Sequence, residues 1–215
     1  MPSEKLSGDT IELGRESVSK LAAQPWTVAI CADASRQIGS GHLMRCLSLA
    51  RALRQIGAEV RFYYAAWPGH ADTWLNAQGF HGELLDFAVD NFLADKDAKD
   101  SANVWSTLWQ QQYGHACLKA WQPWLQSLNT QATSSVHRTI DWCIYDNYGL
   151  AADFVKVIKP SCRQLMAIDD LANREHPVDL LLDQNAVFGM QTRYQTMLPA
   201  ACTQLLGPQY ALLRA

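Results

Sequence analysis

The chain has 215 residues, enough for one large α/β domain or for one domain and the beginning of another. Hydrophobic residues make up 48% and charged residues 18%, so the composition excludes a disordered chain. The net charge of −3 provides no electrostatic footprint for nucleic acid, and no run approaches the ~18 apolar residues of a membrane span. We therefore expect neither a nucleic-acid partner nor a membrane partner.

The six cysteines include no CxxC pair, and four of them lie in apolar runs. This usage favours small buried side chains in a reducing compartment over a disulfide or a zinc site. Residues 1–24 carry seven charges and no apolar h-region, which does not resemble a secretory signal. We expect residues 1–24 to form a flexible leader and the protein to be cytoplasmic.

The first elements alternate between strand and helix. Residues 26–31 are apolar and rich in β-formers, which predicts a buried strand, and residues 32–41 predict a turn. A helical pattern starts near His42, and Gly57 is suited to end it. Residues 59–64 then predict a second strand. This βαβ order implies a Rossmann-like parallel sheet in an α/β fold.

The rest of the chain repeats the pattern less regularly. Helices are expected at 70–78, as a pair within 98–129, and at 151–158. Strands are expected at 83–87, 141–145 and 164–168, followed by an apolar segment at 180–182 and a boundary at 205–208. The tryptophans at 105, 109, 121 and 124 could form a stacking platform for sugars or bases, but their spacing favours a helix core.

Polar clusters follow three of the expected strands, at residues 32–42, 146–149 and 169–174. Ligands of open parallel sheets bind in the crevice outside the carboxyl ends of the strands. Three clusters converging on that edge are a stronger signal than any one of them. We therefore expect the functional site at this edge of the sheet.

A glycine loop, Gly39-Ser40-Gly41, lies between the first strand and the first helix. Two glycines let the backbone turn tightly and approach a ligand closely. The free N–H groups of the first helical turn then favour an anion such as a diphosphate. A plain tight turn would explain the same residues. No GxSxG elbow surrounds Ser40, which argues against a nucleophilic serine.

His42 sharpens this interpretation, because the positive end of a helix dipole favours neutral imidazole, a general base near pH 7. In the alternative interpretation, the histidine has no chemical role and caps the helix by hydrogen bonding. Arg45, one turn on, could face phosphate or water. Asp33, Asp169 and Asp170 follow strands and could position a sugar hydroxyl or cap a helix. The histidines form no cluster with metal-ligand spacing, so we expect no metal and no cofactor.

Four motifs occur in order at residues 32–50 (ADASRQIGSGHLMRCLSLA), 146–150 (DNYGL), 168–174 with 179–185 (IDDLANR, DLLLDQN) and 206–214 (LGPQYALLR). Together they resemble the motifs of the UDP-sugar hydrolases of pseudaminic acid biosynthesis. The resemblance covers about residues 26–215.

The resemblance implies a two-domain fold similar to the B-type glycosyltransferases. It also implies hydrolysis of UDP-2,4-diacetamido-2,4,6-trideoxy-β-L-altropyranose to UDP and the free sugar, with inversion and without a metal. His42 matches the family's general base and Tyr148 an active-site tyrosine. The residues expected to contact the substrate are Asp33, Gly39, Ser40, Gly41, Arg45, Asp169 and Asn185.

The chain departs from the family's pattern at Asn147, where the family usually has histidine. Residues 25–200 are expected to form the N-terminal catalytic-half domain, and residues 201–215 to begin an interdomain segment, with the second domain absent. On this view the chain folds as a monomer but is nearly inert alone. Two alternatives remain: a glycosyltransferase of the same fold, which an acceptor-dependent rate would favour, and a truncated, inactive sugar-nucleotide-binding remnant.

Overall fold

The computed structural model describes residues 25–34, 39–67, 72–86, 107–130 and 139–213. The leader expected at residues 1–24 lies outside these described residues, as does Trp105.

Seven strands form a single sheet in the order β3-β2-β1-β4-β5-β6-β7, and every pairing is parallel. The strands are β1 (Thr27–Ala32), β2 (Glu59–Ala65), β3 (His81–Leu85), β4 (Ile140–Asp146), β5 (Cys162–Ile168), β6 (Leu180–Asp183) and β7 (Thr203–Leu206). The predicted α/β class with a Rossmann-like parallel sheet is therefore confirmed. The chain leaves β1 toward β2 and β3, then returns to build β4 on the other side of β1, so a topological switch lies between β1 and β4.

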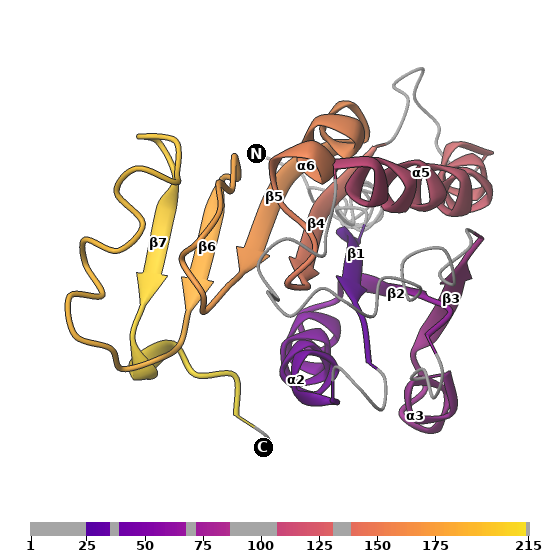
Figure 1. Cartoon of the computed structure of the whole chain (residues 1–215). Helices are drawn as coiled ribbons and strands as arrows, with labels where there is room; N and C mark the ends of the chain where they lie inside the picture. The colour runs from indigo at the N-terminus through magenta and orange to yellow at the C-terminus, as the bar shows by residue number, and fades with distance from the viewer. Residues whose placement is uncertain (1–24, 35–38, 68–71, 87–106, 131–138, 214–215) are drawn as a thin grey trace, which may run out of the picture.

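Helices cover both faces of the sheet, as parallel strands require. Figure 1 shows α5 and α6 on one side and α2 and α3 on the other, with β6 and β7 extending the sheet past them. The helices are α2 (Gly41–Gln55), α3 (Asp72–Ala77), α5 (Thr107–Thr130) and α6 (Ala152–Ile158), with 3-10 turns η2 (Lys159–Ser161) and η3 (Pro208–Tyr210). As predicted, α2 stops just before Gly57, whose φ of +90° suits a helix end.

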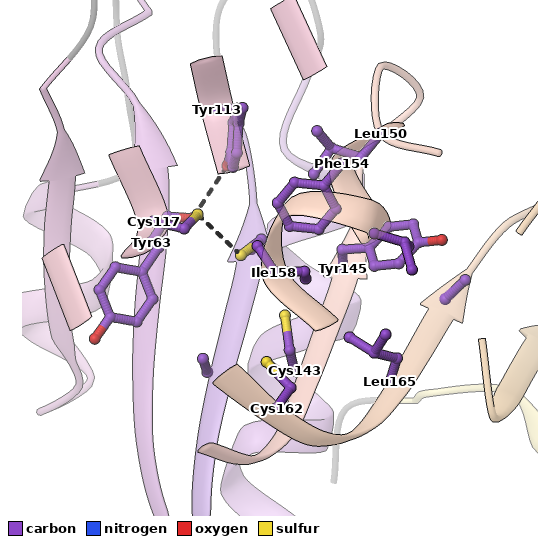
Figure 2. Close-up of a cluster of buried hydrophobic side chains, with 14 of the residues drawn as sticks. Tyr63, Tyr113, Cys117, Cys143, Tyr145, Leu150, Phe154, Ile158, Cys162 and Leu165 are labelled. Carbon is purple, nitrogen blue, oxygen red and sulfur yellow. Dashed lines mark hydrogen bonds between the residues drawn. The ribbon is translucent and has the colours of Figure 1, made fainter. Parts of the chain in front are cut away.

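Strand alternation divides the core into two layers. In β4, Cys143 and Tyr145 face α5 and α6, whereas Trp142 and Ile144 face the α2 side. The first layer contains the packed side chains shown in Figure 2, where Tyr145 lies beside Phe154 of α6. This alternation matters for function, because it also decides to which face of the sheet the polar residues after each strand point.

The structure differs from the sequence expectations at three elements. Strand β3 begins two residues earlier than predicted, at His81. The described part of the expected helix pair, residues 107–130, is one helix that continues through Pro123. Because Trp121 and Trp124 are buried while Pro123 is exposed, core packing on both sides of the proline outweighs its cost to the helix. Thr203–Leu206, expected after the domain, forms the seventh strand of the same sheet.

The interpretations of the cysteines and tryptophans as core residues are confirmed where the structure describes them. All six cysteines are buried and free of disulfides. Trp109, Trp121 and Trp124 of α5 are buried against the sheet. Among the described elements, no helix has both the length and the apolar character needed to cross a membrane.

Replacing Trp121 should test the role of this layer. Trp121 is fully buried, so Trp121→Ala should lower the free energy of unfolding by about 3–5 kcal/mol, measured by urea denaturation. Trp74 of α3 is 52% exposed, and Trp74→Ala serves as the matched control with a change below about 1 kcal/mol. Equal losses in the two variants would contradict the assignment of Trp121 to the core.

Candidate active site

The site lies at the carboxyl ends of β1, β4 and β5, next to the start of α2. β1 and β4 are hydrogen-bonded neighbours on either side of the topological switch, where a crevice opens in sheets of this kind. The chain beyond these three strands carries the polar residues that the sequence singled out. The structure thus brings the three polar clusters to one edge.

Among the described residues, no side chain caps the first turn of α2. Ser40 is the N-cap residue, yet its side chain makes no capping hydrogen bond, and the first turn contains no acidic residue. Gly39 adopts φ +82°, a conformation that favours glycine. A Cβ added at Gly41 would meet no described atom within 4 Å. Within the described part of the chain, the helix start therefore has space for an anion and N–H groups that could donate to it.

His42 is held against the end of β4. Its Nδ1 lies 2.6 Å from Oδ1 of Asp146, and only 7% of the residue is exposed. His42, Arg45 and Cys46 are spaced three and four residues apart, so all three occupy one face of α2. Asp146 follows Tyr145 in the strand and therefore points to that α2 face.

Arg45 faces two carboxylates, rather than phosphate or bulk water. Its Nε and Nη2 donate to Oδ2 and Oδ1 of Asp146 at 2.5 and 2.6 Å, a bidentate pair. Its Nη1 donates to Asp170 at 3.2 Å. Burial alone would raise the pKa of Asp146, but hydrogen bonds from Arg45 and His42 outweigh it and lower that pKa.

This electrostatic arrangement selects one tautomer of His42. An ionised Asp146 can only accept hydrogen bonds, so Nδ1 of His42 must carry the proton. Nε2 is then the basic nitrogen, and among the described residues it has no hydrogen-bond partner. A histidine whose Nδ1–H is held by a buried carboxylate is oriented as a general base.

Tyr148 completes the cluster from the turn after β4. Its ring meets the imidazole of His42 edge-on, with centroids 4.5 Å apart. Burial and a hydrogen bond with Asp170 raise the pKa of Tyr148 to about 12, so the phenol keeps its proton at neutral pH. The residue is still 39% exposed and could contact a ligand.

Three predicted substrate contacts lie elsewhere. Asp33 is 2% exposed and accepts hydrogen bonds from four groups on the α5 side of the sheet. Asp169 is also buried and accepts from the Leu171 and Ala172 amides and from Tyr194. Asn185 follows β6 and donates its amide N–H to Asp183. None of the three has a described contact with the His42 cluster.

Asp146, which sequence reasoning did not select, and Asp170, which it named beside Asp169 but left out of the substrate contacts, provide the contacts to His42 and Arg45. Both are carboxylates at the ends of strands, the same signal that selected Asp33 and Asp169. Consecutive residues at a strand end point to opposite faces of the sheet. Asp146 and Asp170 therefore point toward α2, whereas the residues next to them, Asn147 and Asp169, point to the other face. Knowledge of which residues of β4 and β5 face each layer would have selected Asp146 and Asp170.

A second buried network lies on the face of the sheet opposite α2 and contacts the turn that carries Tyr148. His176 is completely buried, with Nδ1 2.7 Å from the hydroxyl of Tyr145 and Nε2 3.7 Å from Asp169. Arg174 forms a 2.9 Å ion pair with Asp169 and donates to the main-chain oxygens of Asn147 and Leu150. Arg174 therefore joins this network to the turn that carries Tyr148.

No three histidine, cysteine or acidic side chains in the described ranges are grouped so that they could hold a metal ion. No protein-family model matches the chain, and a search of curated proteins found no match. A functional assignment therefore depends on the motifs and on the geometry of the His42 cluster.

The buried His176 predicts a pH-dependent stability. Burial lowers its pKa, the charge of Arg174 adds to this, and Asp169 opposes it. As pH falls through about 6.5, the unfolded chain takes up a proton that the folded chain does not. The free energy of unfolding should therefore fall more between about pH 7.5 and pH 5.5 in the wild type than in a His176→Gln variant.

Urea denaturation at the two pH values measures this difference. The control is His115→Gln, since His115 is exposed on α5, and it should keep the wild-type dependence. Identical pH dependence in the wild type and His176→Gln would show that His176 does not contribute.

Proposed function

We propose that the chain is the N-terminal half of an inverting UDP-sugar hydrolase that acts on UDP-2,4-diacetamido-2,4,6-trideoxy-β-L-altropyranose. The observation that carries the proposal is the 2.6 Å contact between His42 Nδ1 and Asp146, which leaves Nε2 as a base at the start of α2. The four ordered motifs supply the substrate class. In this proposal the complete enzyme has the two-domain architecture of B-type glycosyltransferases and works in the cytoplasm.

His42 acts on the water that attacks the sugar. Nε2 takes a proton from water while the water oxygen forms a bond to the anomeric carbon from the face opposite UDP. The bond between that carbon and the phosphate oxygen breaks, and UDP leaves with the electron pair. Asp146 stabilises the imidazolium that forms, because its negative charge lies 2.6 Å from Nδ1.

The start of α2 serves the leaving group. Negative charge develops on the diphosphate as the bond breaks, and the N–H groups at a helix N-terminus stabilise such charge. Gly39, Ser40 and Gly41 bring the backbone close to it. Arg45 acts indirectly here, since its guanidinium is bound by Asp146 and Asp170. Tyr148 and Asp170, which lie beside His42 and Arg45, then contact the sugar.

Replacing His42 tests the base. The assay uses this chain together with any sequence that continues it in its gene. In that protein, His42→Gln should lower the rate of UDP release by ~10²–10⁴-fold, because the attacking water loses its general base. Glutamine retains an N–H that can still donate to Asp146, so a cooperative thermal melt should persist. UDP release from the UDP-sugar is followed by chromatography.

His115→Gln is again the matched control and should retain full turnover. Near-normal turnover in His42→Gln would rule out the base assignment. A wild-type rate that depends on an added sugar acceptor would instead identify a glycosyltransferase of the same fold.

The glycine loop gives a separate test of the anion site. Gly41→Ala adds a methyl group that meets no described atom within 4 Å, at a helical position, so the melting temperature should not fall. That methyl group would meet a diphosphate bound at the helix start, and UDP affinity should fall by about tenfold, equivalent to ~1.4 kcal/mol. Isothermal titration with UDP measures the change. Unchanged affinity in a folded Gly41→Ala variant would exclude the start of α2 as the diphosphate site.

A further inference from the structure

Asn147 is a buried polar residue whose two side-chain polar atoms both have partners. Its Nδ2 donates to Oδ2 of Asp33 at 2.6 Å, and its Oδ1 accepts the Gly149 amide at 2.7 Å. Its main-chain oxygen accepts from Leu150 and from Arg174. The residue is 6% exposed, so these bonds form away from bulk water and hold the turn after β4 closely.

Asp33 is a rigid anchor for this amide. It follows β1, the strand next to β4, and also accepts from the Ala65 amide at 2.8 Å, Trp67 Nε1 at 3.1 Å and the Tyr113 hydroxyl at 3.2 Å. These donors come from the end of β2, the loop after it and helix α5. Burial raises the pKa of Asp33 to about 6, and the hydrogen bonds from these three donors limit that rise. The amide of Asn147 is thus tied to the packed core.

We infer that Asn147 is a positioning residue that fixes the ring of Tyr148 against His42. Tyr148 follows Asn147 directly, and the hydrogen bonds that Asn147 accepts from Gly149 and Leu150 close the turn around Tyr148. The Tyr148 ring is partly exposed, so its edge-on contact with His42 at 4.5 Å depends on how the backbone presents it. Asp33 acts through Asn147, which assigns this buried carboxylate a role in the site without substrate contact.

The contact can be measured without any enzyme assay. The ring of Tyr148 lies close enough to His42 to shift the NMR signal of its Cε1–H by ring current. Tyr148→Leu should displace that signal, which is assigned by its loss in His42→Gln. Asn147→Ala should move the signal most of the way toward the Tyr148→Leu position, because the turn loses both side-chain bonds.

Two further variants make the result specific. In Asn147→Ser the hydroxyl can still accept from the Gly149 amide, but it is too short to reach Asp33. Loss of the hydrogen bond to Asp33 should therefore shift the signal in this variant. The variant keeps the test decisive even where Asn147→Ala fails to fold. Asn76→Ala removes an exposed amide on α3 and should leave the signal at its wild-type position. A wild-type signal in Asn147→Ser or in Tyr148→Leu would overturn the inference.

The kinetic arm of this test rests on the proposed function. Asn147→Ser should lower kcat by about 10–100-fold with a smaller change in KM, since misplacement by about 1 Å affects the reacting geometry. The double variant Asn147→Ser/Tyr148→Leu should be no slower than Tyr148→Leu alone, because Asn147 acts through that ring. Additive losses would overturn the inference. If the wild-type chain, together with any sequence that continues it in its gene, had no hydrolase activity, the proposed function would be refuted, while the NMR shift would still decide the role of Asn147.

Discussion

The buried carboxylate of Asp146 is the constraint on which this end of the molecule depends. An ionised carboxylate removed from water is costly unless it is paired and hydrogen-bonded. Here Arg45 satisfies it with a bidentate pair and His42 supplies a further short contact. The same interaction docks α2 on β4, keeps Asp146 charged and sets the tautomer of His42. Removal of Arg45 would leave the charge of Asp146 buried with His42 as its remaining partner.

Strand alternation separates the chemistry of the site from its support. Asp146 and Asp170 point to the α2 side, where they meet His42, Arg45 and Tyr148. On the other side, polar residues next to them in the chain form buried networks with the α5 layer and with the segment after β6; these are Asn147 with Asp33, and Asp169 with His176 and Tyr194. The ends of β4 and β5 therefore each contribute one residue to the site and one to the network that supports it.

The two supporting networks meet at the turn of residues 147–150. Asn147 is held by Asp33 from the β1 side, and Arg174 binds the turn from the β5 side while paired with Asp169. The turn is thus fixed from both neighbouring strands, and of its four residues only Tyr148 is exposed. Such support is what keeps the geometry of a site on a loop as well defined as that of one on a helix or strand.

The sequence by itself determined the βαβ order, the parallel sheet, the burial of the cysteines and the edge of the sheet where the polar residues gather. These follow from local patterns: runs of β-formers, helical spacing and glycines at chain turns. It also selected His42 and Tyr148, which the structure brings into contact.

Only the tertiary structure decided that Asp146 and Asp170, and not Asp33 and Asp169, meet the His42 cluster. It also decided that α5 continues through Pro123 and that residues 203–206 join the sheet. The physical reason is that a side chain at a strand end points to one of the two faces of the sheet. Which helix covers that face is decided by how the whole chain packs. That packing joins residues about a hundred positions apart, such as His42 and Asp146, and leaves no mark in either local sequence.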